Sequence, residues 1–184
     1  MKEKIQTMIM PLINSVPYDI YEGLLSVFCI GFVLLLIWKG RKAWSCIALL
    51  LLFEYAFLIY CSTVIFRRVF PERGYDFMPF WSYSRPNLLT ENILNVLLFV
   101  PIGIFMFVTL KGMNKQRSIW LPIFFTGMGL SMGIEILQFA FKKGFAELDD
   151  VIHNTLGCLL GCTLCLIITK VWNCSMSYCR SRLG

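Results

Sequence analysis

Long apolar stretches are the feature that most restricts how this sequence can fold. Five of them occur, over residues 23–38, 43–66, 92–110, 119–141 and 151–172. A helix of about 20 apolar residues crosses a hydrocarbon core about 30 Å thick, which is the length that most of these stretches reach. With 58% hydrophobic and 15% charged residues, the chain is also too apolar for a soluble domain of its size. We therefore expect an all-α, polytopic helical membrane protein with about five transmembrane helices.

The apolar stretches divide the chain into three parts. Residues 1–42 hold an N-terminal interfacial segment and the first span, residues 43–172 a membrane domain of four spans, and residues 173–184 a cytoplasmic tail. An apolar stripe at helical spacing begins the first part: Ile5, Met8, Ile9, Leu12, Ile13 and Val16. Such a stripe is typical of a helix lying in the membrane interface, and a disordered tail is the alternative. No nucleic-acid partner is expected.

Charged residues between the spans predict the orientation. One side of the membrane would hold nine positive residues and no acid: Lys39, Arg41, Lys42, Lys111, Lys115, Arg117, Lys170, Arg180 and Arg182. The other side would hold eight positive residues and nine acids. Two short connections on the first side carry three positive residues each, and short loops carry most weight in the positive-inside rule. We expect a multi-pass plasma-membrane protein with its N-terminus outside and its C-terminus in the cytoplasm.

The eight cysteines do not predict a disulfide framework, because the loops expected outside contain none. Cys158, Cys162 and Cys165 share one helix face. That face could bind a soft metal, but small apolar packing residues are the simpler interpretation. We expect no cofactor and no metal.

Polar residues from several segments are expected at one depth near the outer face. The candidate site consists of Arg67, Arg68, Asn92, Asn95, Glu135, Gln138, Asp149, Asp150, His153 and Asn154. Glu135 lies inside a span, where an ionisable side chain costs about 2.5–3.5 kcal/mol on insertion scales. The spans on either side of Asp149 and Asp150 should form a hairpin, with only a tight turn between them. A GxxxG spacing at Gly157 and Gly161 would let another backbone approach closely.

Four interpretations of this candidate site stay open. The polar groups could simply satisfy one another, or they could bind a headgroup, a phosphate or a peptide, with the arginines meeting the anion. A catalytic site is the third, with His153 as a base oriented by Asp149 one turn before it, although no nucleophile motif is present. Finally, Glu135, Glu147, Asp149 and Asp150 could bind a divalent cation through hard oxygen ligands.

The motifs of four segments resemble the VanZ-like family. The stretch from Asn92 and Asn95 to Pro101 and Gly103 is similar to the N-x-L-x-F-x-P-x-G pattern of that family. Its S-x-x-I-E-x-x-Q helix is matched by Ser131, Ile134, Glu135 and Gln138, its D-D-x-x-x-N-x-x-G segment by Asp149, Asp150, Asn154 and Gly157, and its short Pro-Phe element by Pro79 and Phe80. The resemblance covers residues 49–168 and departs at Lys142 and Lys143, where many relatives have an arginine.

The resemblance implies a role in lowered susceptibility to glycopeptide antibiotics, chiefly teicoplanin, in Gram-positive bacteria. No reaction is established for the family, so no catalytic residue is carried over. Expected partners are membrane lipids and one further molecule: a lipidated antibiotic, a lipid-linked cell-wall precursor or a membrane partner protein. A small membrane enzyme acting on a lipid-linked cell-envelope substrate is the alternative function.

Overall fold

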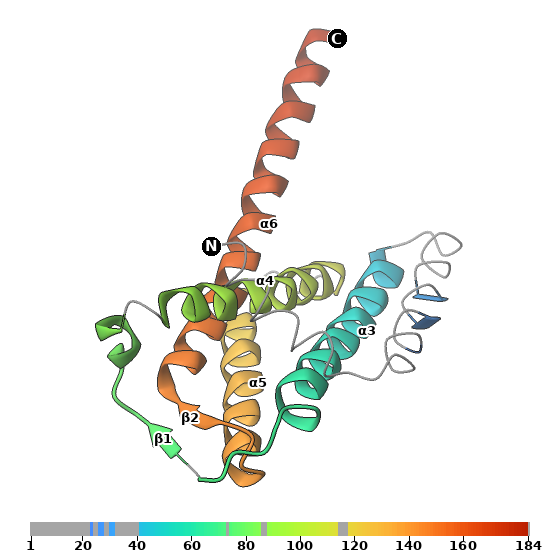
Figure 1. Cartoon of the computed structure of the whole chain (residues 1–184). Coiled ribbons are helices and arrows are strands. Elements are labelled where there is room, and N and C mark those ends of the chain that lie inside the picture. Colours follow the sequence, from blue (N-terminus) through green and yellow to red (C-terminus); the bar gives the residue numbers. More distant parts are fainter. Residues whose placement is uncertain are drawn as a thin grey trace.

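The computed structural model describes residues 23, 26–27, 30–31, 41–72, 74–85, 88–113 and 118–183. Its elements are α3 (Arg41–Tyr60), the π-helix η1 (Cys61–Ile65), β1 (Gly74–Asp76), the 3₁₀ helix η2 (Trp81–Ser84), α4 (Leu89–Gly112), α5 (Trp120–Ala140), β2 (Phe145–Glu147) and α6 (Leu148–Leu183). The segments joining α3 to α4 and α5 to α6 lie together, on the side away from the C-terminus, and we call this region the loop end (Figure 1).

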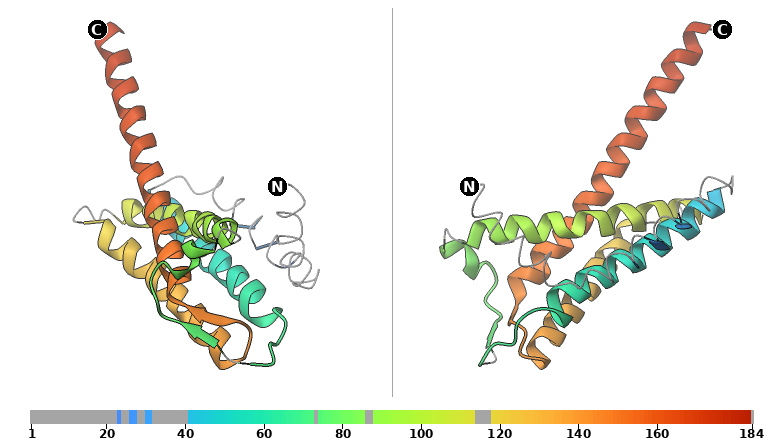
Figure 2. Two further views of the ribbon diagram at one scale, coloured as in Figure 1. Left: turned by 60° about the vertical axis from the view of Figure 1, so that its left-hand side comes forward. Right: turned by 45° about the vertical axis from the view of Figure 1, so that its right-hand side comes forward.

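Four helices in the described part of the chain are long and apolar enough to cross a membrane: Ala43–Ile65, Leu89–Gly112, Trp120–Ala140 and Leu148–Ser177. They confirm the all-α class and four of the expected spans. The fifth expected span, 23–38, falls largely outside the described residues, as does the interfacial segment before it, so the count of spans that the structure supports is four rather than five. Helix α6 passes the expected end of its span and continues to Leu183, beyond all the other helices (Figure 2).

Glycines bring α4 and α6 into backbone contact. A Cβ added at Gly157 would lie 2.2 Å from the carbonyl oxygen of Val96, and one added at Gly161 would lie 2.2 Å from that of Val100. In return, a Cβ at Gly103 of α4 would lie 2.0 Å from the carbonyl oxygen of Cys158. Only a residue without a Cβ fits at these crossings, which confirms the close approach expected from the GxxxG spacing.

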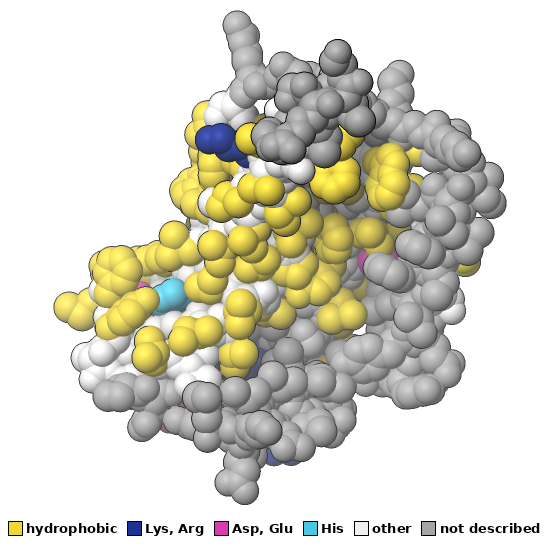
Figure 3. All heavy atoms as spheres, turned by 90° about the horizontal axis from the view of Figure 1, so that it is seen from above, with side chains coloured by type: hydrophobic (Ala, Val, Ile, Leu, Met, Phe, Trp, Pro, Cys, Tyr) yellow, Lys and Arg dark blue, Asp and Glu magenta, His cyan; other side chains and the backbone are white. Residues whose placement is uncertain are grey.

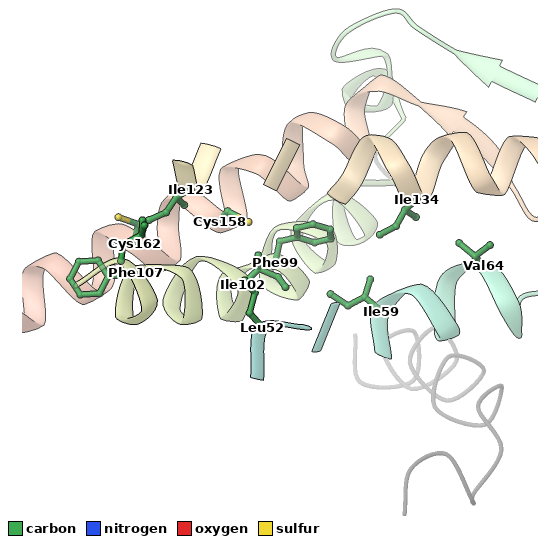
Figure 4. Packing of buried hydrophobic residues seen from close by; sticks show 11 residues of the cluster. Leu52, Ile59, Val64, Phe99, Ile102, Phe107, Ile123, Ile134, Cys158 and Cys162 are labelled. Atoms are coloured by element: carbon green, nitrogen blue, oxygen red, sulfur yellow. The ribbon is translucent and has the colours of Figure 1, made fainter. Parts of the chain in front are cut away.

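The apolar core lies between the four helices (Figure 4). Phe99 and Ile102 of α4 are fully buried at its centre, with Ile59 of α3 on one side and Ile123 of α5 on another. Cys158 and Cys162 of α6 complete the cluster with 0% exposure, as small apolar residues do. Their role is therefore packing.

Large apolar side chains also cover the outside of the helices. Hydrophobic side chains dominate the described part of the face in Figure 3. Examples are Phe53 on α3, Leu97 on α4, Phe125 on α5 and Ile168 on α6, each more than half exposed. A soluble protein rarely leaves so much apolar surface in water, whereas lipid covers it without cost.

The hairpin between α5 and α6 differs from the expected tight turn. Residues Phe145–Glu147 form β2, which pairs in parallel with β1 from the other connection, with Tyr75 opposite Ala146. Helix α5 ends in a Schellman-type cap: the N–H of Lys143 donates to the carbonyl of Gln138 (2.7 Å), and Lys142 adopts a left-handed φ of 55°. Turn residues alone could not reveal this pairing, because the partner strand is about 70 residues away in sequence.

Helix α3 ends in a π-helical turn. The hydroxyls of Ser62 and Thr63 both donate to the carbonyl of Ile59, at 2.9 and 2.7 Å. Phe66 N–H then bonds to the carbonyl of Cys61 five residues back (2.9 Å). From the hairpin, the ammonium of Lys143 donates to the carbonyl of Ile65, the last residue of this turn (3.2 Å), and to that of Arg67, which follows it (2.7 Å). The end of α3 is thus capped by the connection between α5 and α6.

Candidate functional site

Asp149, in the first turn of α6, holds the connection between α3 and α4. Its carboxylate oxygen Oδ1 accepts the backbone N–H of Phe80, and Oδ2 accepts both the N–H (3.0 Å) and the hydroxyl of Ser82. The carboxylate is completely buried. Phe80 has a left-handed φ of 63°, which is uncommon for a bulky residue and directs its N–H to this acceptor. Asp149 therefore fixes the shape of this loop.

Two asparagines of α4 extend the same network. The side chain of Asn92 donates to the Ser82 hydroxyl (2.9 Å), which joins the beginning of α4 to the loop and to Asp149. One turn later, the side chain of Asn95 donates to Oδ1 of Asp150 (2.7 Å). The neighbouring carboxylates of α6 thus serve different partners, because Asp149 holds the loop while Asp150 faces α4.

His153 is buried at 2% exposure beside the same loop. Its Nε2 lies 2.8 Å from the hydroxyl oxygen of Tyr83, and the two rings are 5.7 Å apart between centroids. Nδ1 has no hydrogen-bond partner among the described residues. His153 therefore makes no hydrogen bond to Asp149, whose oxygens accept from the loop, so the structure does not show the expected pairing of His153 as a base with Asp149 as its orienter.

The seam between α5 and α6 holds the remaining members of the expected site. Oε2 of Glu135 accepts a hydrogen bond from the backbone N–H of Glu147 (3.0 Å). A buried carboxylate on α5 is therefore the acceptor for the last N–H of the strand β2. One turn earlier on α5, the hydroxyl of Ser131 accepts the side-chain amide of Asn154 (2.8 Å). The i, i+4 rows Ser131–Glu135 and Asp150–Asn154 therefore face each other across the seam.

Gln138 and the arginines lie at the edge of this seam. The Gln138 amide donates to the carbonyl of Thr63 at the end of α3 (3.2 Å). The Arg67 guanidinium packs near Phe70, 5.8 Å from its ring centroid, and close to Gly144, where an added Cβ would lie 3.1 Å from Nη1. Arg67 interacts electrostatically with both Glu135 and Asp150. Arg68 is exposed, and none of these contacts includes it.

Acidic side chains predominate around Glu147. Burial is the main cause that raises the pKa of Glu147 to about 7, followed by repulsion from Asp150, Glu91, Asp149 and Asp76. This setting disfavours the binding of an anion by the two arginines, because Arg67 faces carboxylates and Arg68 lies apart. The divalent-cation interpretation also fails: Asp149 is occupied by the loop, and within the described residues no group of three His, Cys, Asp or Glu side chains is placed to hold a metal ion.

The structure therefore brings together nine of the ten expected residues through hydrogen bonds or electrostatic contacts, leaving Arg68 outside. Sequence reasoning missed Ser82, Tyr83 and Thr63, whose partners lie 67, 70 and 75 residues away along the chain. Loop hydroxyls carry no periodic signal, and only the neighbouring Pro79 and Phe80 were visible as a motif.

Four apolar helices whose connections are tied together by buried polar side chains define this chain as a polytopic α-helical membrane protein. The VanZ/LLP1 family model matches residues 55–169, well over half of the sequence. The chain belongs to the VanZ/LLP1 family.

A relative in this family is Protein VanZ of Enterococcus faecium, with which this chain shares 33% identity over 102 residues. That match covers 55% of this chain and 58% of the relative, so the chain spans a little over half of the length of the protein it matches. No solved structure matches. The matched region 55–169 contains every residue of the polar network described above.

Proposed function

We propose that this protein lowers the susceptibility of a Gram-positive host to glycopeptide antibiotics, chiefly teicoplanin, by acting at the outer leaflet of the plasma membrane. The observation that carries the proposal is the family match over 55–169, which reaches into all four helices and contains the whole polar network. The molecule bound would be an amphiphile, either the lipidated antibiotic or a lipid-linked cell-wall precursor, and membrane lipids would surround the helices.

The loop end supports this placement by its surface. Tyr75, Phe77, Met78, Phe80 and Tyr83 are each between 55% and 70% exposed, in a segment that Asp149 holds in place. Aromatic side chains are typical of the headgroup layer, where an apolar ring and a polar edge are both satisfied. We call residues 75–83 the aromatic loop. In the proposed orientation the positive connection 111–118 faces the cytoplasm, so the aromatic loop would lie on the outer surface.

Expression in a susceptible Gram-positive host tests the function. We expect the minimum inhibitory concentration of teicoplanin to rise above that of the empty vector, with vancomycin measured in parallel. Membrane fractions must contain equal amounts of protein, because a poorly inserted protein would also give no effect. No change for either drug with the protein present in the membrane would contradict the proposal.

Cysteine labelling tests the orientation separately. In a cysteine-free background, Glu72→Cys reports on the connection between α3 and α4, and Ser118→Cys on the connection between α4 and α5; both positions are exposed. A membrane-impermeant maleimide added to intact cells should label Glu72→Cys and spare Ser118→Cys until the membrane is opened. The reverse pattern would place the aromatic loop in the cytoplasm.

A further inference from the structure

Three acidic residues and one amide lie near one another where α5, β2 and α6 join. Glu135 and Glu147 are placed side by side by the hydrogen bond from Glu147 N–H to Glu135 Oε2 (3.0 Å). Asp150 lies three residues after Glu147, within electrostatic range of both carboxylates. Asn154 follows one turn later on α6, and its amide reaches Ser131, one turn before Glu135. We call Glu135, Glu147, Asp150 and Asn154 the acceptor cluster.

Donors in this cluster are fewer than acceptors. The hydrogen bonds into it come from Glu147 N–H and from the Asn95 amide, and Arg67 and His153 are the basic side chains that interact electrostatically with Asp150. Asn154 is only 5% exposed, and its Oδ1 is buried without a hydrogen-bond partner among the described residues. A buried acceptor of this kind destabilises the folded state unless a donor reaches it. Within the described residues, no donor reaches this oxygen.

We infer that the acceptor cluster binds the protonated primary amine of an amphiphile, with the apolar part of that molecule on the aromatic loop. A primary ammonium brings three N–H donors and one positive charge, which match an unpartnered amide oxygen among carboxylates. A metal ion fits less well, because no three acidic, His or Cys side chains of the described chain converge on a metal position.

The aromatic loop lies next to the acceptor cluster. Tyr75 pairs with Ala146, the residue before Glu147, in the two-stranded sheet. Tyr83 contacts His153, the residue before Asn154, and Phe80 is bonded to Asp149, the residue before Asp150. Exposed rings therefore lie on a segment that contacts both β2 and the first turns of α6, next to the elements that carry the acceptor cluster.

This inference deepens the proposed function by naming the chemistry of the bound molecule, and it rests on that function only for its relevance in the cell. Binding itself is tested with purified full-length protein in detergent. The probe is n-butylammonium, with tetramethylammonium as a cation of equal charge that has no N–H donor. The readout is the midpoint of thermal unfolding, which a ligand of the folded state raises with increasing concentration.

Glu147→Gln is the test variant, because the backbone of Glu147, not its side chain, makes the hydrogen bond to Glu135. Glu72→Gln removes the same charge from an exposed loop position and is the matched control. We expect n-butylammonium to raise the midpoint of the wild type and of E72Q, and to raise that of E147Q much less. Tetramethylammonium should have no comparable effect on any of them.

Two results would overturn the inference: an equal response of E147Q and wild type, or an equal response to both cations. Either would leave the proposed function untouched if expression still raises the teicoplanin inhibitory concentration. Conversely, if the protein binds the amine but its expression does not change drug susceptibility, the proposed function would be contradicted while the inferred amine site would stand.

Discussion

Single polar residues of the loop end each connect two elements. Asp149 joins α6 to the loop that precedes α4, Asp150 joins α6 to α4, and Asn154 joins α6 to α5. Such side chains are expensive in an apolar setting unless every polar atom is paired. Their pairing across elements makes the position of each connection depend on individual side chains.

Replacing Asp149 should release the loop. Asp149→Ala removes an acceptor of three hydrogen bonds and leaves two buried backbone N–H groups to find new partners. A loss of about 1–3 kcal/mol of local stability follows from each group left unsatisfied. Limited chymotrypsin digestion in proteoliposomes should then cut after Trp81 or Tyr83 faster than in the wild type or E72Q. Equal cleavage rates would show that the loop does not depend on this carboxylate.

Glu147 should make stability fall as the pH rises. Its pKa is raised to about 7 in the folded protein, from an ordinary value of 4.5, so the folded state holds more protons between these values. Stability is then lost between about pH 4.5 and 7, by an amount on the order of 1–3 kcal/mol. In E147Q, the midpoint of thermal unfolding should change less with pH over this range. The prediction would be contradicted if the unfolding midpoint rose steadily with pH over this range in both the wild type and E147Q.

At the scale of elements, the connections are determined by backbone geometry as much as by hydrophobicity. Helix α5 stops in a Schellman-type cap although a lysine, not a glycine, takes the left-handed position. The contact between α4 and α6 depends on glycines in both helices. These two features give separate tests of the element ends and of the packing between elements.

Lys142→Gly should stabilise the end of α5. A residue with a Cβ is destabilised by about 1 kcal/mol in a left-handed conformation, and glycine avoids this steric cost. The greater conformational freedom of glycine in the unfolded chain reduces the gain in stability. Lys142→Ala removes the charge but keeps the strained conformation, so it separates the two effects. We expect a higher thermal midpoint for K142G than for K142A; equal midpoints would mean that the cap holds no strain.

Gly161→Ala should separate α4 from α6. The new methyl would lie 2.2 Å from the Val100 carbonyl oxygen, and relief of such a clash typically costs about 1–3 kcal/mol. Gly129→Ala on α5 is the control, since nothing lies within 4 Å of the added atom. G161A should lower the unfolding midpoint while G129A leaves it unchanged or raises it. A tolerated G161A would argue against the close crossing.

For the whole molecule, the sequence predicts which residues lie at the site better than it predicts which of them are hydrogen-bonded to one another. Hydropathy located three of the helices to within about three residues at each end, because each span carries its own apolar signal. It located the beginning of α6 equally well but not its end, since α6 continues past residue 172 to Leu183. Nine of the ten residues expected at the site lie in the polar network, since a polar side chain in or beside a span is conspicuous. Pairings were not predictable: Ser82 and β2 have partners far away in sequence, and no local pattern encodes those distances.

The most direct test of the account is the teicoplanin inhibitory concentration of cells expressing wild type, Asp149→Asn and Glu72→Gln at equal membrane levels. Asp149→Asn keeps the size of the side chain, but its amide nitrogen cannot accept the hydrogen bonds that Ser82 donates. We predict that wild type and E72Q raise the inhibitory concentration above the vector, whereas D149N falls back toward it. Full protection by D149N would contradict the claim that the fixed aromatic loop is what the protein uses.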